Sequence, residues 1–301
     1  MELAVRFAYM FLLVAVGVGG RRVGLLTQHR NERLGQVAFY VLMPSLIFVS
    51  TYDEDLGALL SLDLVVGLLS VLALLIVLAW VSNRRGENRV RSVSLIQSYH
   101  GNFGYFGVPV VAATLGSTAA AIASVILGLA SVIQIPLTVS VLVGMNDAEA
   151  AFGAEVKSVV TNPMLLALAV SLCFASFGLP VPEAVDASLE GVSSLALPVA
   201  LLAVGGSLNP AGSGIPLGRT GMVVGLKVLV MPLVAYVVFT GLGTDVLTRN
   251  AAIVMFGSPT AVSTYVYATE LGGDAEFASV NVFATTLASI ASLFLLLQFV
   301  L

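Results

Sequence analysis

The feature that most constrains this chain is the recurrence of apolar runs long enough to cross a lipid bilayer. Of its 301 residues, 58% are hydrophobic and only 10% are charged. A helix needs about 20 residues to span the hydrocarbon core, and it satisfies its own backbone hydrogen bonds there. The run 64–81 is apolar on every face, whereas the strands of a membrane barrel alternate apolar and polar residues. The sequence therefore predicts an all-α polytopic membrane protein.

Charged residues cluster in short connections, which divide the chain into predicted spans. Their approximate limits are 4–20, 34–51, 62–82, 92–115, 118–143, 158–178, 187–208, 218–241, 249–271 and 276–300. Ten basic residues fall on one side of the membrane and two on the other: Arg21, Arg22, Arg30, Arg33, Arg84, Arg85, Arg89, Arg91, Lys157 and Arg219, against Arg6 and Arg249. The positive-inside rule assigns the first side to the cytoplasm. We expect a multi-pass cell-membrane protein with both termini extracellular or periplasmic.

Five predicted spans precede the central connection and five follow it, an odd number that places the second half upside down in the membrane. The predicted fold is two inverted repeats of five helices, residues 1–143 and 158–301, joined by a short cytoplasmic linker at 144–157. No connection is long enough to form a soluble domain. Function must therefore reside within the bundle of membrane helices.

Four prolines are spaced as a repeat predicts. Pro44 corresponds to Pro198 at an offset of 154 residues, and Pro109 corresponds to Pro259 at an offset of 150. The alternative is that these prolines only kink their helices, because proline is common in membrane helices.

Predicted spans four and nine carry the densest helix-breaking sequences. The segment 101–109 contains three glycines, Gly101, Gly104 and Gly107, and ends at Pro109. The segment 257–260 begins with Gly257, Ser258 and Pro259 in succession. Proline removes a backbone donor, and glycine is a poor helix former. Both spans are predicted to break near the middle of the membrane. Broken helices at matching positions of inverted repeats indicate a transport site, where half-helix N-termini attract anions.

Three polar side chains within the spans are candidates for contact with a substrate. Lys227 lies in span eight, where a cation costs about 3 kcal/mol or more, so it either attracts an anionic substrate or pairs with half-helix carbonyls. Asn102 precedes Pro109 by seven residues, and its amide either contacts a carboxylate or caps the half-helix. Gln134 in span five either contacts the ligand or joins two helices by a hydrogen bond.

Other polar residues have simpler interpretations. His100 titrates near neutral pH when unperturbed, but a lone histidine beside a loop is more often structural. Asp63 begins span three, where a carboxylate either carries a proton or, as is commoner, interacts with the helix dipole. The single cysteine, Cys173, is expected to be a small core residue.

Several classes of function are disfavoured by missing motifs. The two breaks contain no carboxylate, which a sodium/proton antiporter with broken helices would need. The sequence shows no His, Cys and Glu cluster at metal-ligand spacing, no phosphate-binding loop and no intramembrane protease motif. We expect no enzyme activity, no metal, no cofactor and no nucleic-acid partner.

The motifs together resemble the auxin efflux carrier family, which includes the plant PIN exporters and many prokaryotic relatives. The pattern from Asn102 to Pro109 resembles the family's first crossover helix, and Gln134 matches a glutamine of its fifth helix. The segment Lys227–Pro232 matches a basic residue five positions before a proline, and Pro259–Glu270 resembles the second crossover. The large hydrophilic loop of long plant members is absent, as in prokaryotic forms.

The resemblance implies a homodimeric carrier of small organic anions that works by elevator-type alternating access. The fold would be shared with sodium/proton antiporters and bile-acid symporters. Two residues depart from the family pattern: Met255 stands where a glutamine is expected, and Thr269 stands where a lysine is expected. The expected substrate is therefore a small carboxylate in general, auxin-like or malate- or malonate-like, rather than auxin in particular. The alternatives are a sodium-coupled organic anion symporter and a membrane sensor. The predicted site residues are Asn102, Gly104, Pro109, Gln134, Lys227, Ser258, Pro259 and Thr260, with Asp63, His100 and Lys227 as candidates for proton or charge coupling.

Overall fold

The computed structural model of the chain describes residues 2–149, 157, 159–207 and 216–299. Within these residues the regular secondary structure is helical, and the only strand-like pairing is an isolated antiparallel bridge between Gly101 and Thr260. Much of the predicted linker lies outside the described residues, as do the first residue of predicted span six (158) and the last residues of spans seven and ten (208 and 300).

The helices follow the predicted spans closely in the first half of the chain. They are α1 (Glu2–Arg22), α2 (Gln28–Val37), η1 (Ala38–Leu42), α3 (Met43–Thr51), α4 (Leu56–Leu59), α5 (Leu62–Ser82), α6 (Asn88–Tyr99), η2 (Phe103–Gly107), α7 (Val108–Leu115) and α8 (Ser117–Asn146). The second half contains α10 (Pro163–Phe177), α11 (Glu183–Ser193), α12 (Ala196–Ser207), α13 (Leu217–Val224), η3 (Gly225–Val230), α14 (Met231–Gly241), α15 (Val246–Phe256), α16 (Ser263–Glu270) and α17 (Ala275–Phe299).

Seven helical segments of the described chain are long and apolar enough to cross a membrane. They are Leu3–Arg22, Gln28–Thr51, Leu62–Ser82, Ser117–Asn146, Glu183–Ser207, Leu217–Gly241 and Ala275–Phe299. Three further apolar helices are shorter: Phe103–Leu115, Pro163–Phe177 and Val246–Phe256. The prediction of a helical multi-pass membrane protein is confirmed. The arrangement as ten spans in two inverted repeats stays a prediction.

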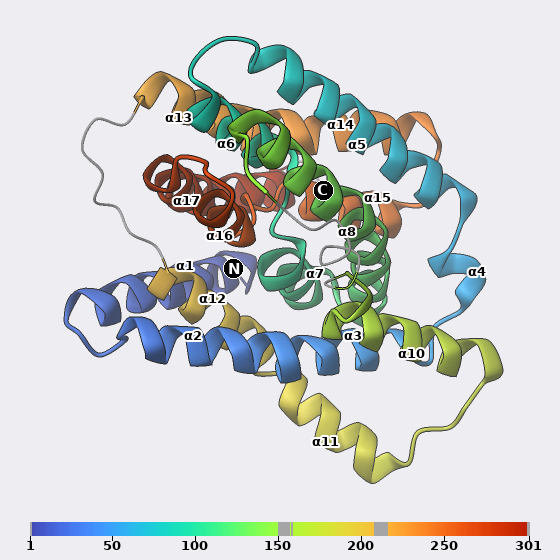
Figure 1. Cartoon of the computed structure of the whole chain (residues 1–301). Coiled ribbons are helices and arrows are strands. Elements are labelled where there is room, and N and C mark those ends of the chain that lie inside the picture. The colour runs from blue at the N-terminus through green and yellow to red at the C-terminus, as the bar shows by residue number, and fades with distance from the viewer. Residues whose placement is uncertain (1, 150–156, 158, 208–215, 300–301) are drawn as a thin grey trace.

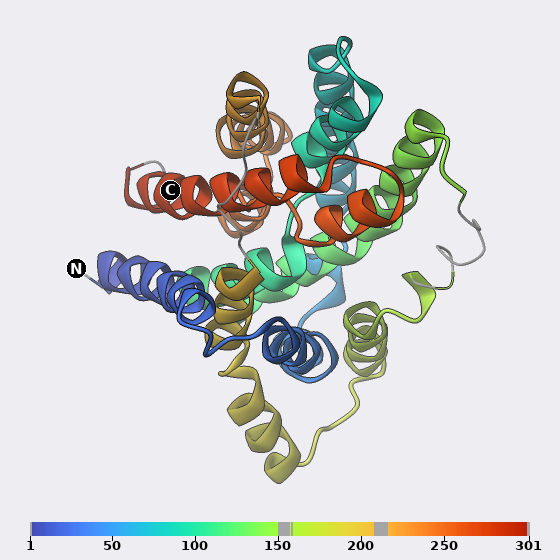
Figure 2. The ribbon, with the colours of Figure 1, turned by 60° about the vertical axis from the view of Figure 1, so that its left-hand side comes forward.

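The helices pack as two groups (Figures 1 and 2). The first group consists of α1, α2, α3, α10, α11 and α12, which contact mainly one another, and the second consists of α5, α6, α13, α14, α15, α16 and α17. Helices α7 and α8 lie where the groups meet, because each contacts members of both. In both views the first group lies below and α5 with α14 lies above.

Close packing of small residues joins α1 to α12 within the first group. A Cβ atom added to Gly17 would lie 2.9 Å from the Cα atom of Gly205, and one on Gly205 would collide with the carbonyl oxygen of Val14. In a bilayer, lipid tails compete with apolar side chains, so close backbone approach of this kind holds helices together.

Three π-helical turns share one cause. Each of η1, η2 and η3 ends two residues before a proline: Pro44, Pro109 and Pro232. Proline lacks a backbone donor and its ring clashes with the carbonyl of the preceding turn, so that turn widens. Pro109 therefore lies in the first turn of α7, and the break in predicted span four falls earlier, at His100–Asn102. The break in span nine falls at residues 257–262 and includes Pro259.

The prediction that Cys173 is a core residue is wrong. Cys173 lies on α10 and is exposed. Helix α10 packs mainly against α3 and also contacts α8, η1 and α4, and Cys173 lies on a part of its surface that stays exposed. A free cysteine behaves as a small hydrophobe, which a lipid-facing surface tolerates as well as a protein core does.

Candidate functional site

Two unwound segments, between α6 and η2 and between α15 and α16, lie side by side and are joined by backbone hydrogen bonds. The N–H of Asn102 donates to the carbonyl of Pro259 at 2.8 Å, and the N–H of Ala261 donates to the carbonyl of His100 at 3.1 Å. The hydroxyl of Thr260 also donates to the His100 carbonyl, at 3.3 Å. These contacts bring together segments that lie about 160 residues apart in sequence. We call this pairing the crossover.

Side chains from α8 support the end of α6 at the crossover. The amide of Gln134 donates to the carbonyl of Tyr99 at 3.1 Å. The hydroxyl of Thr138 lies 2.8 Å from Nδ1 of His100 and 3.1 Å from the Tyr99 hydroxyl. Gln134 thus makes a hydrogen bond between helices, which is one of the two roles considered from the sequence. His100 has a structural partner in Thr138.

Two buried polar atoms at the crossover have no hydrogen-bond partner in the described part of the chain. They are the amide nitrogen Nδ2 of Asn102 and the hydroxyl Oγ of Ser258. The side chain of Asn102 does not cap η2, whereas its backbone carbonyl accepts from the N–H groups of Phe106 and Gly107. Leaving a buried polar group unpaired costs about 1–3 kcal/mol, so such groups call for an explanation.

Lys227 lies in η3 and is fully buried, with 0% of its surface exposed. Its Nζ donates to Sδ of Met231 at 3.0 Å and lies 5.8 Å from the centroid of the Phe103 ring, the first residue of η2. Sulfur is a weak acceptor and an aromatic face attracts a cation only modestly. In the described part of the chain no carboxylate pairs with Lys227, so a cation beside the crossover lacks a compensating anion.

The remaining predicted residues take different positions. Thr260 is fully buried, and its N–H lies 3.3 Å from the hydroxyl of Thr285. Gly104 faces Met164, because a Cβ atom there would lie 2.9 Å from the sulfur. Asp63 is exposed in the first turn of α5 and takes part in none of the crossover hydrogen bonds described above. This position agrees with a helix-dipole role for Asp63.

A cavity of about 290 Å³ lies between the first helix group and α7. Its wall consists of Tyr9, Leu46, Ser193, Ser194, Leu197 and Pro198 from the first group and Pro109, Ala112 and Ala113 from α7. This volume is near the lower end of the range for small-molecule sites, about 300 Å³. Asn102 and Ser258 are not among the residues that line this cavity, and they are buried, with 4% and 0% of their surface exposed.

A second buried polar cluster joins α6 to α16 and α17 and was not predicted from the sequence. Gln97 donates to the hydroxyl of Thr264 and to the carbonyl of Ala278, both at 3.0 Å, and accepts from the amide of Asn281 at 2.8 Å. The sequence feature that could have indicated this cluster is the amide side chain of Asn281 within an apolar span. The serines at 193 and 194 gave no comparable signal, because a hydroxyl near a helix end is common.

Comparison with known proteins identifies the family of this chain. A family model described as membrane transport protein matches residues 4–158 and 150–297, which together cover nearly the whole chain. An uncharacterized transporter of Methanothermobacter thermautotrophicus is 27% identical over 253 residues, covering 81% of this chain and 82% of the relative. The resemblance to the auxin efflux carriers is therefore confirmed, and the chain belongs to the membrane transport protein family that includes them.

Proposed function

We propose that this transporter carries small organic anions and that a substrate carboxylate binds at the crossover. The observation that carries the proposal is the pair of unpartnered buried groups, Nδ2 of Asn102 and Oγ of Ser258, on the two paired segments. Both can donate a hydrogen bond, which is what a carboxylate requires. The cation of Lys227 near Phe103 supplies the opposite charge.

Movement of one helix group against the other would provide access to this site. The cavity that reaches Pro109 lies between the first group and α7, so a displacement of the groups would deepen it toward Asn102. We propose elevator-type alternating access of a ten-span protein with two inverted repeats, acting as a homodimer in the cell membrane with both termini outside. The charge asymmetry of the connections supports this orientation.

Uptake by purified protein in liposomes tests the proposed function. A panel of radiolabelled carboxylates, including an auxin and malate, is compared with neutral analogues of the same size. Ser258→Ala should reduce carboxylate uptake, because the proposed site loses a donor. Ser94→Ala is a matched control, since the Ser94 hydroxyl on α6 is equally buried and unpartnered but lies outside the crossover. Equal loss in both variants, or no carboxylate uptake by the wild-type protein, would contradict the proposal.

A sodium-coupled symporter is the second candidate, favoured by the cluster around Gln97. The amide oxygen of Asn281 is buried there without a partner in the described chain, and hard cations prefer oxygen ligands. Replacing external sodium by choline should abolish uptake if coupling occurs. Unchanged uptake would exclude this candidate and leave the anion carrier.

A further inference from the structure

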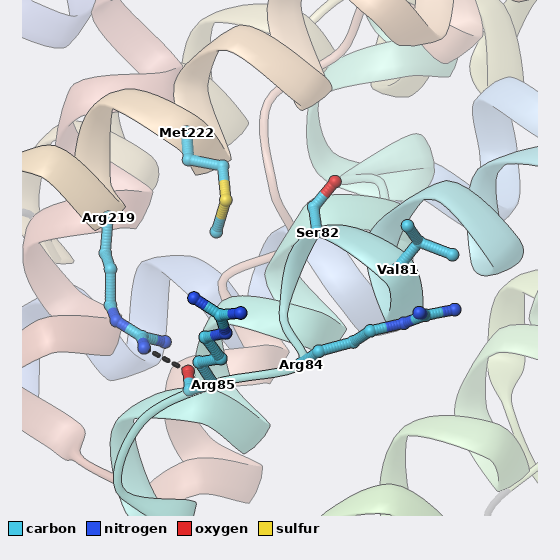
Figure 3. Close-up of a pocket in the computed structure, with 6 residues that line it drawn as sticks. All are labelled: Val81, Ser82, Arg84, Arg85, Arg219 and Met222. Carbon is cyan, nitrogen blue, oxygen red and sulfur yellow. Dashed lines mark hydrogen bonds between the residues drawn. The ribbon is translucent and has the colours of Figure 1, made fainter.

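A second cavity lies away from the crossover, where α5 ends and α13 begins (Figure 3). Its volume is about 370 Å³, and its wall is formed by Val81, Ser82, Arg84, Arg85, Arg219 and Met222. We call it the arginine pocket. The guanidinium groups of Arg85 and Arg219 lie together on one side of it, and the Arg84 side chain extends in the other direction from the adjoining backbone. From the sequence, these arginines indicate only which side of the membrane faces the cytoplasm.

Backbone contacts hold two of the arginines together. The guanidinium of Arg219 donates to the backbone carbonyl of Arg85. It lies against Gly86, whose φ of 114° and lack of a Cβ atom permit the contact, since a Cβ atom would collide with the guanidinium. The Nη1 atom of Arg219 is buried and has no partner in the described chain. The pocket thus contains an unsatisfied, charged donor.

Among the residues that the structure describes, none that lines the arginine pocket is acidic. Glu87, the nearest acidic residue along the chain, is exposed and does not contribute to the wall. In the described part of the chain no carboxylate pairs with Arg84, Arg85 or Arg219. Like charges gathered without an anion repel one another, and a bound anion would relieve that repulsion.

The other arginines of the same connection differ. Arg89 donates to the carbonyl of Gly272 at 3.1 Å, and Arg91 donates to the carbonyl of Asn83 at 2.6 Å, so their positions are explained by packing within the protein. The guanidinium of Arg84 lies over the Trp80 ring at 5.4 Å. No hydrogen-bond acceptor within the described chain engages the side chain of Arg84 or Arg85.

The pocket lies at the ends of two membrane spans, the depth at which lipid headgroups lie. Trp80 is 54% exposed, and tryptophan beside a span end is typical of the membrane interface. Leu217 at the start of α13 is 79% exposed, and Val81 and Met222 line the wall, so an apolar surface adjoins the basic groups. Free phosphate would use only the arginines, whereas a phospholipid would use both surfaces.

We propose that the arginine pocket binds the phosphate headgroup of an anionic phospholipid, with an acyl chain lying over Val81 and Met222. Arginine suits this ligand because its planar guanidinium donates two parallel hydrogen bonds to phosphate. The basic side of the bundle is the one that the positive-inside rule assigns to the cytoplasm, where the leaflet carries anionic lipid. The site joins α5 to α13 within the second helix group, so the lipid would stabilise contacts within that group.

Native mass spectrometry of the delipidated protein, titrated with phosphatidylglycerol, tests the proposal. The test variant is Arg84→Gln/Arg85→Gln, which leaves the Arg219 bond to the Arg85 backbone available. Each basic residue near an anionic membrane surface contributes roughly a fivefold factor in affinity, so binding should weaken about 30-fold. The control is Arg22→Gln/Arg33→Gln, which removes two exposed charges from the same predicted face and should change affinity less than about twofold.

Further arms separate the alternatives. Arg84→Lys/Arg85→Lys keeps the charges but loses the paired guanidinium donors. Its affinity should therefore lie between those of the wild-type protein and the glutamine variant, whereas a misfolded variant would not bind. Phosphatidylcholine and inorganic phosphate should each bind far more weakly than phosphatidylglycerol. Equal phosphatidylglycerol affinity in the test and control variants would overturn the site, and inorganic phosphate binding as tightly as phosphatidylglycerol would overturn its assignment to a lipid.

Discussion

The N–H of Asn102 donates a 2.8 Å hydrogen bond to the carbonyl of Pro259, so main-chain atoms join the two unwound segments. The isolated bridge between Gly101 and Thr260 continues this pairing. Since backbone atoms form these bonds, a substitution of the Asn102 side chain leaves them available. Effects of such a substitution therefore report on the unpartnered amide rather than on the crossover itself.

Asn102→Ala should weaken carboxylate binding by about 1–3 kcal/mol, the cost of an unmatched polar group in a buried site. Thermal stability in detergent should change little, because the amide Nδ2 has no partner in the described chain. Binding is measured by isothermal titration with the best substrate of the transport panel. Asn31→Ala is the contrasting control: Asn31 bonds the carbonyl of Ala203 at 3.1 Å, so its loss should lower the melting temperature and spare affinity. The reverse pattern would assign Asn102 a structural role.

Lys227→Met should separate stability from transport. A cation within the membrane costs about 3 kcal/mol, so its removal should leave the melting temperature unchanged or higher. Carboxylate affinity should fall while a neutral analogue binds as before. Lys227→Arg keeps the charge and should retain more uptake. Unimpaired carboxylate uptake by Lys227→Met would show that the cation is not part of the site.

Gln134→Leu should lower thermal stability, because the Tyr99 carbonyl loses its donor. The expected loss is about 1–3 kcal/mol. Gln134→Glu, which preserves the size but replaces the amide donor, should behave similarly at neutral pH. Melting curves and substrate titrations are compared for both variants. Reduced affinity with an unchanged melting temperature would instead make Gln134 a ligand contact.

Asp245 precedes α15 and accepts a 2.9 Å hydrogen bond from the N–H of Thr248. Partial burial raises the pKa of this carboxyl, but hydrogen bonds from Thr248 and the adjoining backbone outweigh it and leave the pKa below its ordinary value. Its stabilising effect is therefore present above the unfolded pKa and is lost as the pH falls through the folded pKa.

Asp245→Ala should cost about 1 kcal/mol at pH 7, the usual effect of losing a helix cap. The difference in melting temperature from the wild-type protein should shrink below about pH 4, where an unperturbed aspartate is protonated. Asp245→Asn retains a capping oxygen and should lie between the two. A deficit of Asp245→Ala that stays constant with pH would show that the cap acts without its charge.

Accessibility of introduced cysteines tests the orientation. In a Cys173→Ala background, cysteines replacing Asp53 or Glu183 should react with an impermeant reagent on intact cells. Cysteines replacing Glu87 or Asp147 should react only after permeabilisation. All four positions are exposed in the structure, so sidedness alone should govern labelling. Equal labelling of the four would contradict the inverted arrangement.

The sequence by itself determined the medium and the secondary structure of this protein. Transfer into a bilayer is a sum over residues in a local window, so apolar runs such as 64–81 could be identified without contacts. The breaks were also predicted locally, because glycine and proline weaken a helix wherever they occur. The first break falls at His100–Asn102, where the glycine-rich segment begins, whereas Pro109 lies in the first turn of α7, a position that proline favours.

Only the tertiary structure decided which polar groups have partners. Gln134 bonds the Tyr99 carbonyl, and the Lys227 ammonium faces Met231 and Phe103, whereas the amide of Asn102 is left without a partner in the described chain. Composition cannot distinguish these cases, because each depends on how helices distant in sequence approach one another. Arg219 reaches the carbonyl of Arg85 across 134 residues of sequence, and no local pattern encodes that contact.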